Sequence, residues 1–104
     1  MLKEFNDSMF EGFKDEDVCV VQYSAAWCGP CKSLKPIMDK LSEEYKDRAK
    51  FFYADIEDSA INTASGAMIR GVPTVIIYRK GQEIDRKVGG VPESNMREFL
   101  DNSI

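Results

Sequence analysis

The sequence contains no histidine in its 104 residues. Imidazole is the usual proton carrier near neutral pH and the commonest metal ligand, so histidine-based acid–base catalysis and most zinc sites are excluded. Cysteine is scarce, with three residues. Three cysteines are too few for a disulfide scaffold, and an odd number cannot all pair within one chain. A close cysteine pair in such a chain is therefore expected to be catalytic or metal-binding rather than structural.

Long apolar runs and basic stripes are missing as well. The longest apolar run is about six residues, whereas a membrane helix needs roughly 20, so we expect no membrane span. Residues 1–7 turn polar at once and offer no signal-peptide core, which predicts a cytoplasmic location. The net charge of −4 with interspersed signs argues against nucleic-acid binding. Length and an apolar fraction of 43% predict one domain over residues 1–104, which we expect to act as a monomer.

Apolar runs predict the strands of a central sheet. Residues 18–23 are β-favouring and apolar on both faces, which is typical of a central strand covered by helices above and below. Residues 51–56 and 75–78 predict two further buried strands. The pair Lys80-Gly81 predicts a tight turn into a half-exposed strand over 84–88, in which Ile84, Arg86 and Val88 on one face alternate with Asp85 and Lys87 on the other.

Helical periodicity fills the segments between these strands. Asp7 and Ser8 are the expected caps of a first helix. A second helix starts at the cysteine pair and is expected to kink at Pro36. A weaker helix covers 58–67, and Pro92 starts the last one. The order β-α-β-α-β-α-β-β-α predicts an α/β fold with a central mixed β-sheet of four to five strands, flanked by about four helices and ending in an antiparallel hairpin.

The strongest chemical signal is the run Trp27-Cys28-Gly29-Pro30-Cys31-Lys32. It follows a predicted strand and opens a predicted helix, where free N–H groups and the positive end of the helix dipole stabilise a thiolate at Cys28. The two cysteines lie within one helical turn, so their sulfurs can reach bonding distance. Gly29 permits the tight turn, and Pro30 fits an early helical position because its missing N–H would be unpaired there anyway.

Two other interpretations of this cysteine pair remain open. A Cys-x-x-Cys can be half of a zinc site, but Cys19 is the only other thiol, so zinc would need ligands from a partner chain. The two cysteines can also be structural and fall at a helix start by chance. Cys19 itself lies within the predicted central strand, and we expect it to be a small buried apolar residue.

Four motifs together resemble the thioredoxin family. The run 27–32 matches that family's active-site signature residue for residue. Ile69-Arg70-Gly71-Val72-Pro73-Thr74 resembles its cis-proline loop, Lys87-Val88-Gly89-Gly90 is similar to its third motif, and Glu98-Phe99-Leu100 is similar to its last helix. The first three motifs occur in the family's order and spacing, and the likeness covers nearly the whole chain. The resemblance implies the thioredoxin fold.

The resemblance also implies a catalytic cycle. Cys28 attacks the disulfide of a target protein, Cys31 resolves the mixed disulfide, and a thioredoxin reductase, an NADPH- or ferredoxin-dependent flavoprotein, restores the dithiol. The reacting group is the disulfide itself, so we expect no cofactor and no metal. The pair Gly29-Pro30 resembles that of strongly reducing members, whereas oxidising and isomerase-type members carry histidine there.

A substrate groove around Cys28 follows from the same resemblance. The Val72–Pro73 bond is expected to be cis, and Val72 would offer its backbone to an extended substrate as a short added strand. The groove would be lined by Trp27, Ile56, Gly71, Val72, Val88, Gly89 and Gly90. A less functional interpretation is that Gly89-Gly90 only ends a strand and that Ile56 belongs to the core.

The sequence departs from the family at two places. Where the family usually has a buried aspartate, with a lysine on the adjacent strand, this chain has Gln22 and Tyr53. Glutamine is no base near pH 7, so we expect Cys31 to lose its proton to water, held by Gln22. Before Ile69, the run Gly66-Ala67-Met68 replaces a charged residue, an aromatic and a glycine. Met68 then either alters partner docking or only fills the loop.

Three functions are compatible with these observations. The first is a general dithiol reductase that serves several target proteins. The second is a thioredoxin-fold binding module in which the cysteines are incidental, and the missing base keeps it open. The third is a dedicated electron carrier for one reductase and one target.

Overall fold

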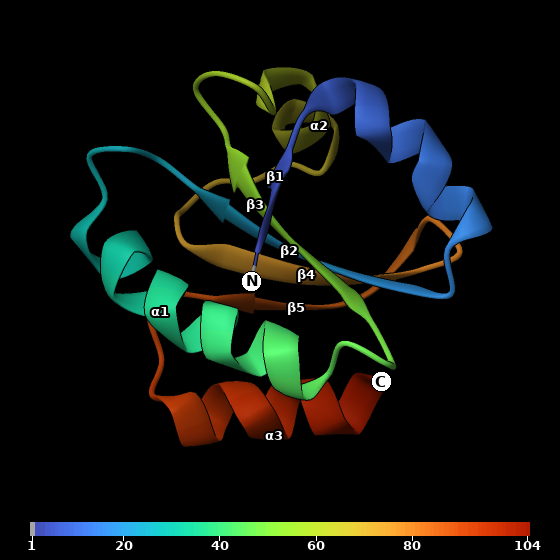
Figure 1. Ribbon diagram of the computed structural model, residues 1–104. Helices are drawn as coiled ribbons and strands as arrows, with labels where there is room; N and C mark the ends of the chain where they lie inside the picture. The colour runs from blue at the N-terminus through green and yellow to red at the C-terminus, as the bar shows by residue number, and fades with distance from the viewer. Residues whose placement is uncertain (1) are drawn as a thin grey trace.

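The computed structural model describes residues 2–104. Five strands form one sheet, and four helical segments flank it (Figure 1). The strands are β1 (Lys3–Phe5), β2 (Val18–Ser24), β3 (Lys50–Asp55), β4 (Thr74–Arg79) and β5 (Gln82–Val88). The helices are η1 (Asp7–Asp15, a 3₁₀ helix), α1 (Gly29–Glu44), α2 (Ile61–Gly66) and α3 (Glu93–Ser103).

The sheet is mixed and has the order β1-β3-β2-β4-β5. β3 pairs in parallel with β1 and β2, whereas β4 is antiparallel to both β2 and β5. Helices α1 and α3 cover one face, while η1 and α2 cover the other (Figure 1). The predicted α/β architecture and the terminal hairpin are thus confirmed.

Successive side chains of β2 pack alternately into two separate cores, and every residue of the strand is buried. Val20 packs on one face with Leu34 of α1 and Met96 of α3. Cys19 packs on the other face, among the aromatic rings around Phe13 of η1. The central position expected for residues 18–23 follows from this two-sided burial, which also confirms Cys19 as a buried residue.

The N-terminal segment confirms one prediction and corrects another. The first strand of the predicted order is β1, in which only Phe5 is buried. η1 is capped by Asn6, whose Oδ1 accepts from the Ser8 N–H, and not by Asp7 or Ser8. Asp7 instead reaches across to the start of α2, because the Asn6 side chain already occupies the capping position of η1.

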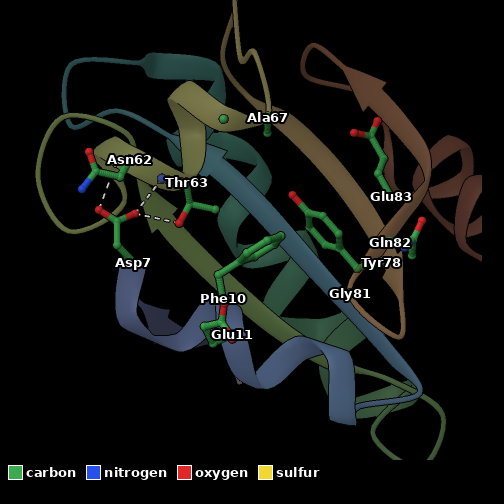
Figure 2. Close-up of a pocket in the computed structure, with 11 residues that line it drawn as sticks. Asp7, Phe10, Glu11, Asn62, Thr63, Ala67, Tyr78, Gly81, Gln82 and Glu83 are labelled. Atoms are coloured by element: carbon green, nitrogen blue, oxygen red, sulfur yellow. Dashed lines mark hydrogen bonds between the residues drawn. The ribbon is translucent and has the colours of Figure 1, made fainter.

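The Asp7 carboxylate acts as the cap that α2 does not supply for itself. It accepts hydrogen bonds from the Asn62 N–H (3.0 Å), the Thr63 N–H (2.7 Å) and the Thr63 hydroxyl (2.7 Å), as Figure 2 shows. Ala60, the residue at the N-cap position, has no side chain able to do this. α2 is shorter than the predicted 58–67, because Asp58–Ala60 form turns before it.

The remaining differences lie in the C-terminal half and in α1. A β-bulge at Ile77/Tyr78 shifts the pairing of β5, and Ile84 is 42% exposed, so the expected alternation is wrong. Pro92 was predicted to be the first residue of the last helix, but it is the N-cap residue, and α3 begins at Glu93. Helix α1 continues through Pro36, and the kink expected there stays a prediction. The turn at Lys80-Gly81 is confirmed, with φ of 53° and 82°.

Candidate active site

Cys28 and Cys31 form a disulfide where β2 leads into α1, with their Cα atoms 5.3 Å apart. Cys28 is the N-cap residue of α1, as predicted, and its Sγ accepts from the Cys31 N–H at 3.2 Å. Both side chains are buried, Cys31 completely. The first-turn N–H groups of α1 therefore point toward Cys28 Sγ, which is the geometry that stabilises a thiolate there after reduction.

The immediate surroundings of the two sulfurs are apolar. Ala25 is buried with the cysteines, and Ile56 and Val72 pack against the three. Trp27 is 68% exposed beside them, and its indole N–H donates to Glu57 Oε1 at 2.8 Å. That bond anchors the ring edge and leaves its apolar body at the surface, where a bound protein can cover it.

The cis-proline loop meets the cysteine turn. The Val72–Pro73 bond is cis, as the resemblance implied. The Thr74 hydroxyl donates to the Gly71 carbonyl at 2.6 Å, and this bond braces the loop. Among residues 2–104, neither the N–H nor the carbonyl of Val72 has a hydrogen-bond partner, so both remain available to an extended segment.

The glycine motif after β5 closes the other side of the site. The Gly89 N–H donates to the Pro73 carbonyl at 2.8 Å, and Gly89 has a φ of 97° that side chains rarely tolerate. A Cβ on Gly90 would lie 3.3 Å from Pro30 Cβ. Gly89-Gly90 therefore does more than end a strand: it joins the cis-proline loop to the active-site turn. The structure brings the predicted groove residues together, namely Trp27, Ile56, Gly71, Val72, Pro73, Val88, Gly89 and Gly90, with Gly29, Pro30 and Lys32 exposed beside them.

Gln22 lies fully buried beneath Cys31. Its Nε2 donates to the Cys31 carbonyl at 3.1 Å and to Ser24 Oγ at 3.0 Å. The Cys31 carbonyl can only accept, which fixes the orientation of the amide. Gln22 Oε1 is left without a hydrogen-bond partner among the described residues. A buried amide oxygen in this state costs about 1–3 kcal/mol unless a water donates to it.

Two site residues were not identified from the sequence. Ser24 holds the Gln22 amide, and the signal was available, because residues two apart on a strand share a face. Glu57 holds Trp27 from 30 residues away, and no local pattern indicates that contact. Tyr53 lies beside Gln22 on β3 and is itself uncharged, but the ammonium of Lys35 from α1 lies 4.8 Å from its ring centroid.

Cys19 takes no part in this site. It belongs to the core on the η1 face, and burial raises the pKa of its thiol to about 11. A hollow of about 600 Å³ opens on that same face between η1, α2 and β5 (Figure 2). It is lined by Phe10 and Tyr78 and does not reach the disulfide. Within residues 2–104, no cluster of three potential metal-ligating side chains and no helix able to cross a membrane is found.

Comparisons with known proteins extend the likeness beyond the motifs. The family model described as Thioredoxin matches residues 2–102. Thioredoxins from Staphylococcus aureus strains Mu50, MW2 and N315 are similar to this chain. Each is 32% identical to it over 98 residues, which cover 94% of this chain and 93% of the relative. The similarity therefore includes the whole sheet as well as the cysteine turn.

Proposed function

This chain belongs to the thioredoxin family of thiol–disulfide oxidoreductases, and we propose that it reduces protein disulfides through Cys28 and Cys31. The Cys28 thiolate attacks one sulfur of a target disulfide, which releases one target thiolate and leaves a mixed disulfide. The Cys31 thiolate then attacks Cys28 Sγ, releases the second target thiolate and closes the Cys28–Cys31 disulfide. Two electrons pass to the target, whose two thiolates take up two protons.

The position of Cys28 carries this assignment of roles. Cys28 is the N-cap of α1 and receives an N–H from the first helical turn, whereas Cys31 lies one turn deeper and fully buried. A target disulfide approaching from solvent meets the turn at Cys28 first. Because the same N–H groups stabilise a thiolate, the cysteine that is reached first is also the one that is activated.

The groove supplies a binding mode for the target. The unpaired N–H and carbonyl of Val72 can form strand-like hydrogen bonds with an extended segment, and such pairing does not depend on sequence. Trp27 and Val88 are both largely exposed and offer apolar area on either side. These features support a reductase with several target proteins rather than a binding module, because the free backbone groups of Val72 and the exposed Trp27 and Val88 side chains lie around the cysteine turn.

The partner that restores the dithiol belongs to this proposal as well. Thioredoxins in general are re-reduced by a thioredoxin reductase, and we assign an NADPH- or ferredoxin-dependent flavoprotein to this role. The disulfide serves as the redox group, with no further cofactor, in a monomer. A cytoplasmic location suits this chemistry, because a reducing compartment supplies the electrons.

Proton removal from Cys31 needs a route that does not use a buried carboxylate. Gln22 contacts the Cys31 carbonyl and leaves Oε1 unpaired in a buried position. A water donating to Oε1 would satisfy that atom and take the Cys31 proton as the thiol ionises. Thiols ionise far more readily than hydroxyls. Having Gln22 in place of a carboxylate therefore slows the resolving step by at most the low end of the ~10²–10⁴-fold typical of a lost general base.

The test is reduction of a disulfide-bonded protein by dithiothreitol, with and without catalytic amounts of this chain. We expect acceleration by the wild type and none by Cys28→Ser. Cys19→Ser is the matched control, because it removes one thiol that lies in a separate core. Equal rates for wild type and Cys28→Ser would contradict the reductase assignment and favour the binding module.

A further inference from the structure

Met68 has a backbone conformation that its residue type does not favour. Its φ is 57°, in the left-handed region, which is strained for a residue with a Cβ. The only other non-glycine residue with positive φ among residues 2–104 is Lys80, which lies in the hairpin turn that requires it. Met68 is also 62% exposed, so burial in the core does not offset the strain.

The Met68 side chain borders a hollow of about 390 Å³. Ile61, at the start of α2, lines the same hollow and is 51% exposed. Two large apolar side chains thus remain at the surface on either side of one depression, where each would be expected to turn inward or be replaced by a polar residue. Methionine adapts its shape to varied apolar partners, which suits a binding surface better than a fixed core.

The hollow is continuous with the cysteine site. Ile56 lines it and also packs against the cluster of Ala25, Cys28 and Cys31. At its other side the hollow is lined by Arg70, next to the Gly71–Pro73 loop that offers its free backbone to a substrate. The hollow lined by Met68 and Ile61 is therefore adjacent to the place where a segment bound at Val72 would meet Cys28.

Charge at the rim defines the segment further. Arg70 is exposed and forms no ion pair or hydrogen bond with any residue of the described part of the chain. Glu57, which follows Ile56 in the sequence, accepts a hydrogen bond from the Trp27 indole. An unpaired guanidinium in a protein of net charge −4 favours an acidic partner group, since it can form charge-assisted bonds to a carboxylate.

We propose that Ile61, Met68 and Arg70 form a second subsite that selects disulfide substrates with a large apolar side chain and an acidic residue near the reactive cysteine. This inference rests on the proposed reductase function. The occupant is an extended segment of the target protein. The apolar side chain enters the hollow between Ile61 and Met68, and the carboxylate pairs with Arg70.

The test compares two peptides that differ only beside the attacked cystine, one carrying Leu and Asp and the other Ser and Asn. We expect wild-type kcat/KM to favour the Leu-Asp peptide by on the order of tenfold, the usual effect of filling an apolar pocket. Met68→Gly and Ile61→Ser should each bring this ratio toward one. Arg70→Glu should reverse the preference when Lys replaces Asp in the peptide.

The controls separate this subsite from the cysteine chemistry and from folding. Ile84→Ser removes an exposed isoleucine of β5 that lies outside the hollow, and both rates should stay at wild-type values. Met68→Gly should unfold at a higher denaturant concentration than wild type, because glycine relieves the strained φ. A wild-type ratio of one, or a ratio unchanged in Met68→Gly and Ile61→Ser, would overturn the subsite and leave the reductase intact. No reduction of either peptide or of a small aromatic disulfide would overturn both.

Discussion

At the scale of single residues, the site depends on what the buried amide of Gln22 does. The amide places a donor on the Cys31 carbonyl and leaves its own oxygen unpaired, in a position where thioredoxins usually carry a carboxylate. A buried carboxylate would be a better base and a worse core residue. Catalysis and stability should therefore change in opposite directions at this position.

We predict that Gln22→Asp speeds the resolving step and lowers the free energy of unfolding by about 1–3 kcal/mol, the usual cost of an imperfectly paired buried charge. The resolving rate is measured by rapid quench of the mixed disulfide, and stability by urea titration. Gln22→Met is the matched control: it removes the unpaired oxygen without adding a base, so it should not accelerate resolution. An Asp variant with neither effect would refute the proposed role of Gln22.

At the scale of elements, α2 is held by a carboxylate from a different helix. Asp7 of η1 caps the Asn62 and Thr63 N–H groups, and the Thr63 bonds are the main reason that the pKa of Asp7 lies below its ordinary value. Because the folded-state pKa is lowered, the cap is present above the unfolded-state pKa and is lost as pH falls through the lowered value. The hollow of the proposed subsite lies against α2, so this cap also supports the position of Ile61.

We predict that Asp7→Asn increases amide hydrogen exchange at Asn62 and Thr63 several-fold at neutral pH, because a neutral amide is a weaker acceptor than the carboxylate. The central strand β2 should keep its protection. Asp15→Asn, at the opposite end of η1, removes the same charge without a contact to α2 and should leave exchange at both positions unaltered. Equal acceleration by both variants would show that net charge matters rather than the cap.

The elements also show which parts of the fold can be predicted from the sequence. Strands β2, β3 and β4 were predicted within about two residues, because each is a continuous apolar run that helices cover on both faces. The predicted order includes a first strand without its bounds, because the three residues of β1 have one buried side chain and no periodicity, and pairing with β3 defines them. The bulge in β5 likewise depends on its pairing partner rather than on its own residues.

The residues of the candidate site likewise differ in whether the sequence alone could identify them. Cys28, Cys31 and Pro73 were identified because their motifs are local and specific. The contacts of Gln22 with the Cys31 carbonyl and of Trp27 with Glu57 join residues that are distant in sequence, so only the folded chain reveals them. Sequence thus locates the reacting sulfurs, and the structure supplies their support.

At the scale of the whole molecule, the core on the η1 face contains an ionisable pair. The hydroxyls of Tyr23 and Tyr78 lie 2.7 Å apart and are buried, and burial is the main reason that the pKa of each lies above its ordinary value of 10.0. The unfolded chain ionises these tyrosines above about pH 10, whereas the raised pKa values keep them protonated to higher pH in the folded chain. The contribution of this pair to the free energy of unfolding is therefore fully present below pH 10 and decreases as pH rises further.

We predict that the free energy of unfolding falls as pH rises from 9 to 11, with a slope of at most about 1.4 kcal/mol per pH unit for each tyrosine. The measurement is a urea titration at each pH in a Cys19→Ala background, which removes thiol exchange with the disulfide in the unfolded chain. The double variant Tyr23→Phe/Tyr78→Phe should lose much less over this range, because phenylalanine has no hydroxyl to ionise in the unfolded chain. An equally steep fall in that variant would place the effect elsewhere.

The assignment of Cys28 as the attacking sulfur and Cys31 as the resolving sulfur is tested most directly by trapping the mixed disulfide. Cys31→Ser and Cys28→Ser proteins are each reduced, mixed with a disulfide-bonded target and analysed by mass spectrometry. We predict that Cys31→Ser retains the target through Cys28 and releases it with dithiothreitol, while Cys28→Ser, whose remaining active-site thiol is fully buried, retains none. Equal trapping by both variants, or attachment through Cys19, would contradict the assignment of Cys28 as the attacking sulfur.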